Sequence, residues 1–86
     1  MAIRTNYIFK GIEIKDCYAN ISVHIDKPAP SKISTRYIVG VFTPLKEYLI
    51  ESIVCDIELD LDSNVIKQCY EDLKSREGFK DATDEI

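Results

Sequence analysis

Four residues, Asp60, Asp62, Asn64 and Glu71, have the types and the spacing of a calcium-binding loop. They match positions 1, 3, 5 and 12 of the EF-hand loop, whose oxygen atoms surround the cation. Position 6 of that loop is a glycine that permits a sharp turn, and it is Val65 here. No helical pattern precedes Asp60 either. The favoured interpretation is therefore the solvent face of a strand running into a helix cap, with no metal or cofactor bound.

Thiol and imidazole chemistry would depend on His24, the one histidine, and on Cys17, Cys55 and Cys69. The three cysteines are widely spaced and form no C-x-x-C pair, so they match neither a disulfide framework nor a zinc site. All three occupy apolar positions of their local pattern, whereas His24 falls on the polar side of a strand. We expect three buried reduced thiols, made in a reducing cytoplasm, and an exposed histidine. No residue pattern predicts an enzyme.

Alternating acids offer a different chemistry. Asp56, Glu58, Asp60 and Asp62 recur at every second residue. Such residues repeat at about 6.6 to 6.8 Å along a strand, which is similar to the phosphate spacing of one DNA strand. This geometry suggests an acidic DNA mimic, although solvated strand faces are commonly acidic.

The charges are unevenly distributed along the chain. Residues 1–46 hold seven Lys/Arg against three Asp/Glu, a net +4, and residues 47–86 hold four against twelve, a net −8. A molecule polarised in this way can pack copies head to tail, basic face on acidic face. The alternative is that both faces are simply solvated. The acidic total argues against nucleic acid as a partner.

Length and composition are those of one small globular domain. The chain has 86 residues, of which 45% are hydrophobic and 30% charged. So short a chain buries about two-thirds of its unfolded surface, and assembly would bury more. No apolar run approaches the roughly 18 to 20 residues that span a bilayer, and the N-terminus has no apolar segment typical of a secretion signal. We expect a domain over residues 1–80 with an acidic tail over residues 81–86.

Hydrophobic periodicity predicts four strands. Residues 7–14 alternate weakly, Lys15-Asp16 resembles a hairpin turn, and residues 17–25 alternate cleanly, with one face buried. Two prolines make residues 27–32 a loop. Residues 34–43 are β-branched and aromatic, which predicts a strand covered on both faces at its middle. For residues 46–55 a helical spacing competes with alternation, and we favour a fourth strand over residues 48–61.

The helix follows directly. Ser63 or Asp62 is the predicted N-cap. The apolar stripe consists of Val65, Ile66, Cys69, Tyr70 and Leu73. Gly78 suits the left-handed stop, Phe79 is expected to fold back, and residues 81–86 have little to bury and should be loose unless a partner orders them. The predicted fold is α+β, a four-stranded antiparallel sheet with one C-terminal helix (β-β-β-β-α).

The order of these pieces resembles a family of small proteins of tailed bacteriophages. In that family an apolar strand runs into LDLD, as in residues 59–62, and then into an Ile-x-Gln-x-Tyr-x-x-Leu-Lys helix, as in residues 66–74. A Phe before ATD corresponds to Phe79 and residues 82–84. Residues 7–12 and Tyr18 fit the family's opening. Cys69 and Arg76 depart from it, because relatives carry a small residue and a Leu-Pro pair there.

The resemblance implies a non-enzymatic virion component, of the tail, baseplate or head, that assembles with copies of itself and with other phage structural proteins. It would be synthesised in the host bacterial cytoplasm and would bind no membrane. The alternative is a host-directed inhibitor that binds a bacterial defence or replication protein, possibly as a DNA mimic. The resemblance transfers no site residues. The contact surface that we expect comprises Pro28, Pro30, Lys32, Asp56, Glu58, Asp60, Asp62, Phe79, Asp81 and Asp84.

Overall fold

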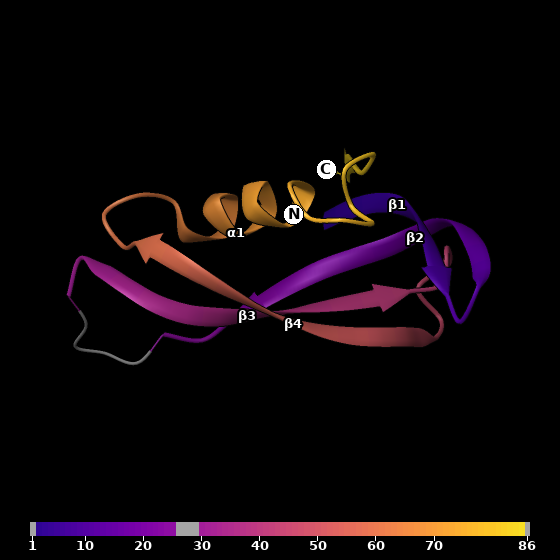
Figure 1. Ribbon diagram of the computed structural model, residues 1–86, viewed down its shortest axis with the longest axis horizontal. Coiled ribbons are helices and arrows are strands. Elements are labelled where there is room, and N and C mark those ends of the chain that lie inside the picture. Colours follow the sequence, from indigo (N-terminus) through magenta and orange to yellow (C-terminus); the bar gives the residue numbers. More distant parts are fainter. Residues whose placement is uncertain (1, 26–29, 86) are drawn as a thin grey trace.

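The computed structural model describes residues 2–25 and 30–85, which form a five-stranded antiparallel sheet with a helix on one face (Figure 1). The elements are β1 (Ala2–Phe9), β2 (Ile12–Val23), β3 (Lys32–Phe42), β4 (Leu49–Asp60), α1 (Val65–Lys74) and β5 (Thr83–Glu85). Their order across the sheet is β4-β3-β2-β1-β5. The antiparallel α+β fold with one helix is confirmed. The predicted order lacked the fifth strand, so the helix lies between β4 and β5 rather than at the end.

The first hairpin turns at Lys10 and Gly11, so the prediction of one strand over 7–14 and a turn at Lys15-Asp16 is wrong. Both turn residues have positive φ, +51° and +80°, which is the geometry that two-residue hairpin loops require. Asp16 also has positive φ, +58°, but it lies within β2. There the β1–β2 register shifts between Thr5 and Tyr7. Asp16 therefore belongs to a bulge, not to a turn.

A Gly11→Ala substitution is expected to lower the free energy of unfolding by about 1 kcal/mol, because a Cβ disfavours the left-handed region. Nothing lies within 4 Å of the position that this Cβ would take, so backbone conformation and not a clash is the cause. Urea unfolding of Gly11→Ala measures the effect, with Lys10→Gly as the control. Lys10→Gly leaves two residues that both adopt positive φ easily. A larger loss of unfolding free energy in Lys10→Gly than in Gly11→Ala would contradict a turn at these two residues.

The strands bury one face and expose the other. On β3, Tyr37 and Val39 are fully buried, whereas Ile38 between them is 48% exposed. The prediction that the middle of this strand is covered on both faces is therefore wrong. A single helix can cover only one face of the sheet, and α1 lies against one face (Figure 1). Tyr37 and Val39 belong to the same buried cluster as Leu73 of α1, so they lie on the covered face.

The strand interpretation of residues 48–61 is confirmed, and the competing helix is not observed. β4 pairs with β3 from Lys32↔Asp60 to Phe42↔Leu49, with a register shift near Val41. Cys55 and Leu59 point into the core, while Asp56 and Glu58 are exposed. Alternation over ten residues therefore outweighs the helical spacing of its first half.

The helix α1 is capped by Asn64, not by Ser63 or Asp62 as predicted. The Asn64 side chain accepts a hydrogen bond from the Lys67 amide at 3.0 Å. Cys69, Tyr70 and Leu73 of the predicted stripe are buried, whereas Ile66 is exposed, and the first turn has no acidic residue. The C-cap is Ser75, so Gly78, with φ +91°, lies in the following turn rather than at the helix end.

Residues 83–85 form a strand, in contrast to the prediction of a loose tail. Thr83–Glu85 pairs with Ala2–Arg4 of β1 as an edge strand. Lys74 on the helix forms an ion pair with Asp84. As predicted, Phe79 folds back: it is 4% exposed and its ring lies 5.9 Å from that of Tyr7.

The sheet curls strongly about this core. Tyr7 on β1 donates a hydrogen bond to Glu51 Oε1 on β4 at 2.8 Å, although two strands separate β1 from β4 in the sheet. Such a contact requires the inner face to be concave. The concave face encloses the rings of Tyr7 and Phe79. The exposed side chains of β3 and β4 lie on the opposite, convex face.

Candidate protein-interaction surface

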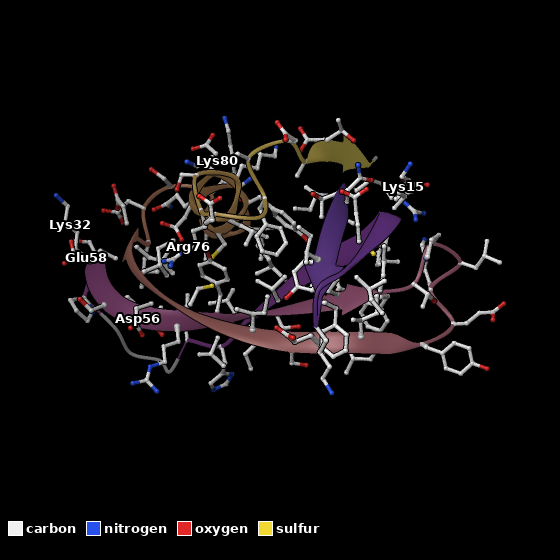
Figure 2. All side chains as sticks on the ribbon, turned by 45° about the vertical axis from the view of Figure 1, so that its right-hand side comes forward. Lys15, Lys32, Asp56, Glu58, Arg76 and Lys80 are labelled. Atoms are coloured by element: carbon white, nitrogen blue, oxygen red, sulfur yellow. The ribbon has the colours of Figure 1, made fainter. Side chains whose placement is uncertain are left out.

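The residues predicted to form the contact surface divide into two groups in the structure. Lys32, Asp56, Glu58 and Asp60 lie on neighbouring positions of β3 and β4, with exposed Pro30 and Asp62 beside one end. Figure 2 shows Lys32 next to Glu58 at one end of the molecule, with Asp56 nearby. Pro28 lies outside the described residues.

The second group belongs to the segment after the helix. Phe79 is buried, so its side chain cannot form part of a contact surface, and Asp84 is paired with Lys74. Asp81 is exposed and lines an open depression beside β1, together with Arg4 and Lys80. The predicted residues therefore do not make one continuous surface.

Opposite charges alternate across β3 and β4 instead of separating into two faces. Arg36 lies opposite Asp56 and Lys32 opposite Asp60 in the register. Arg36 Nε is 3.1 Å from Asp56 Oδ1, in an exposed pair that adds little stability. The halves of the chain that differ in net charge are thus adjacent in space. On β3 and β4 the charges therefore form a mixed row and not a purely acidic one, which weakens the resemblance of β4 to a DNA strand.

The calcium-loop residues do not surround a common point. Asn64 Oδ1 caps the helix, Asp60 Oδ1 accepts from the Asp62 amide at 3.0 Å, and Glu71 lies along the helix beside Lys67. Among residues 2–25 and 30–85, no three His, Cys, Asp or Glu side chains are grouped as metal ligands would be.

The thiols and the histidine lie where the sequence places them. Cys17, Cys55 and Cys69 are free and buried, and His24 is exposed. Burial raises the pKa of the Cys17 and Cys69 thiols above the usual value, with a further upward effect of nearby carboxylates. A raised pKa disfavours the thiolate, which is the nucleophilic form.

Gln68 on α1 and Arg76 just after it cover part of the open edge of β4, a role that the sequence analysis did not assign to either residue. Gln68 accepts from the Asp60 amide at 2.9 Å and donates to the Asp60 carbonyl at 2.8 Å. Arg76 donates to the Asp56 carbonyl at 2.7 Å. Gln68 thus satisfies Asp60 as a neighbouring strand would. No local signal identifies these residues, because their role depends on where the helix packs.

Arg76, labelled beside the helix in Figure 2, also completes a polar cluster with Tyr37 and Asp72. The Tyr37 hydroxyl donates to Asp72 Oδ2 at 2.5 Å, and Arg76 Nε donates to the same oxygen at 2.9 Å. Burial, followed by the hydrogen bond with Asp72, raises the pKa of Tyr37 far above its usual value. The Asp72 hydrogen bond likewise raises the pKa of Arg76, so the guanidinium remains charged. The cluster fastens the end of α1 to β3 and β4.

Large apolar side chains are exposed at the opposite end of β4. Leu45, Tyr48 and Leu49, in and beside the β3–β4 turn, are 78%, 70% and 54% exposed. Val54, further along β4, is 60% exposed and lies directly opposite Ile38. Grouped exposed apolar residues commonly mark protein contacts. We call these five residues the apolar surface.

The chain matches no protein-family model, no curated protein and no solved structure. Within the described part of the chain, no helix has the length and apolar character needed to cross a bilayer. The site is therefore interpreted from its own geometry.

Proposed function

We propose that this chain is a non-enzymatic structural component of a tailed-bacteriophage virion that acts by protein–protein assembly. The resemblance of its sequence to small phage proteins supports the virion setting. The observation that carries the assembly role is the apolar surface, because three neighbouring large side chains at a hairpin tip are exposed to half or more of their area. A small domain stabilises itself by burying such residues against other subunits.

The mode of assembly that we propose is contact with copies of itself and with other phage structural proteins. β4 is an edge strand with a neighbour on one side, and edge strands are templates for pairing with another chain. The mixed charges on β3 and β4 would then set the orientation of neighbouring subunits. The host-directed inhibitor remains the second candidate, but the basic partners of Asp56 and Asp60 give it less support as a DNA mimic.

Mass spectrometry of purified particles from a phage that carries this gene tests the proposal. We expect peptides of the chain in a fixed ratio to the major capsid protein, in multiples of three, five or six for each vertex or ring. Abundance in infected cells with absence from particles would contradict a virion role and favour the host-directed candidate.

A paired substitution tests the apolar surface itself. Leu45→Ser with Tyr48→Ser should leave stability within about 0.5 kcal/mol, because both side chains are exposed, and should reduce incorporation into particles by about tenfold or more. Ile66→Ser on the helix is the control, since Ile66 is 39% exposed and lies away from the hairpin tip. Normal incorporation of the double variant would show that the tip is not a contact site.

A further inference from the structure

The backbone groups of β4 alternate between β3 and the open edge. The Leu61 amide donates to the Ser31 carbonyl, on the side of β3, at 2.6 Å. Asp60 instead directs both its amide and its carbonyl to Gln68, and Asp56 directs its carbonyl to Arg76. In an antiparallel pair the direction of the backbone amide and carbonyl reverses at every residue. The backbone groups of the even-numbered residues of β4 therefore point to the open edge. The register is regular back to Glu51, so Ser52 and Val54 face it as well.

Within residues 2–25 and 30–85, the side chains that bind this edge all lie along one half of it. Gln68 of α1 and Arg76 after the helix occupy the edge groups of Asp60 and Asp56, and acidic side chains flank them. Ser52 and Val54 lie beyond these contacts, and both side chains are exposed. Natural edge strands are commonly protected by Lys, Pro, a bulge or a covering element. The segment from Ser52 to Val54 carries no Lys or Pro, and an apolar Val54 stands at its outer face.

We propose that the uncovered half of β4 pairs antiparallel with the same segment of a second copy, around a two-fold axis at Ile53. This inference rests on the proposed assembly role and specifies its partner, orientation and register. Ser52 of each copy lies opposite Val54 of the other, and the pair of strands forms about four hydrogen bonds between the chains. The two five-stranded sheets become one continuous sheet. Val54 and Ile38 of both copies then lie on the same outer face.

Charge favours this register over the alternatives. The antiparallel arrangement places Asp56 opposite Ile50 of the second copy, so its carboxylate does not lie opposite another carboxylate. A parallel arrangement in register, or a two-fold axis at Asp56, would place carboxylates side by side, which is destabilising. The axis cannot move toward Asp60 either, because Gln68 already occupies the amide and the carbonyl there.

Light scattering after size-exclusion chromatography tests the dimer, over a concentration series that reaches about 1 mM because the interface is small. We expect the wild-type mass to rise from 9.8 kDa to twice that value, and Val54→Lys to remain at 9.8 kDa throughout. Ile8→Lys is the matched control, since Ile8 is 66% exposed and lies on β1, and it should dimerise as the wild type does. A wild type that stays monomeric at every concentration overturns the proposal, as does a Val54→Lys variant that dimerises normally.

Disulfide cross-linking tests the register. A mixture of Ser52→Cys and Val54→Cys chains should form a disulfide heterodimer under mild oxidation, because opposed residues in a hydrogen-bonded pair have Cα atoms about 5.5 Å apart. Each variant alone should link at least tenfold less, since its own copies lie diagonally at about 7 to 8 Å. Glu58→Cys, on the covered half, is the negative control, and preferential linkage at Glu58→Cys would overturn the register. The native cysteines are buried and do not interfere.

The two proposals can fail separately. A chain that dimerises with the expected cross-links but is absent from particles retains this inference and loses the virion role. The opposite result is a chain that is present in particles at fixed stoichiometry but neither dimerises nor cross-links through Ser52 and Val54. That result retains the virion role and overturns the proposed dimer.

Discussion

Replacing Leu73 by alanine is expected to lower the free energy of unfolding by about 3 kcal/mol. Leu73 is fully buried on the face of α1 that meets the sheet, so the substitution removes methyl groups and leaves a cavity in the core. One helix covers this sheet, and few other contacts can compensate. A loss of this size is a large part of the stability of a small domain.

Ile66→Ala on the same helix is the matched control. Ile66 is 39% exposed, so its loss should cost about 1 kcal/mol or less. Urea unfolding gives both values, and the slope of the transition should stay constant if only the folded state changes. Equal losses at the two positions would show that α1 does not pack on the sheet through Leu73.

Raising the pH above about 10 is expected to destabilise the fold steeply, because three tyrosines are held in their neutral form. Burial, assisted by the hydrogen bond with Glu51, raises the pKa of Tyr7 to about 12. Burial also raises the pKa of Tyr37, with a further contribution from Asp72, and that of Tyr70. The unfolded chain then loses its phenolic protons at a lower pH than the folded chain.

The sign of the effect follows from linkage. Below about pH 10 both states keep these protons, and the tyrosines' contribution to stability is complete. Above it the unfolded state ionises first, so stability falls as the pH rises toward the folded value of about 12 for Tyr7. The raised pKa values of Cys17 and Cys69 act in the same direction from about pH 8.5.

Urea midpoints measured between pH 7 and pH 12, together with tyrosinate absorbance, check this prediction. Tyr7→Phe is the informative variant, because it removes one titrating group and should make the decline above pH 10 shallower. A wild type whose tyrosines all ionise near pH 10 without any loss of stability would contradict the structure's placement of Tyr7 and Tyr37.

Hydrophobic periodicity alone predicted the elements that bury one face against the core. The alternation of Ile53, Cys55, Ile57 and Leu59 predicts β4, and the spacing of Cys69, Tyr70 and Leu73 predicts α1, because a sheet and a helix each bury side chains at a fixed period. The period of buried side chains is the same however the strands and the helix are arranged in space.

The predictions were wrong where the residue pattern fits two local structures equally well. Weak alternation extends on both sides of Gly11, so it does not distinguish a turn at Lys10-Gly11 from one at Lys15-Asp16. The positive φ values of both Lys10 and Gly11 decide the turn, and β2 absorbs Asp16 as a bulge. Thr83–Glu85 has little strand tendency of its own and becomes a strand because the edge of β1 is beside it.

The chain's own sequence therefore determined the strand β4, the helix α1 and most of the side chains that these two elements bury, since periodicity and side-chain chemistry act over neighbouring residues. The tertiary structure alone decided which groups meet. Strand pairing placed Arg36 and Lys32 opposite acids that are 20 or more residues away, and packing of α1 brought Gln68 and Arg76 to one half of β4. Contacts over such separations depend on how whole elements pack, and they determine which half of this edge remains open.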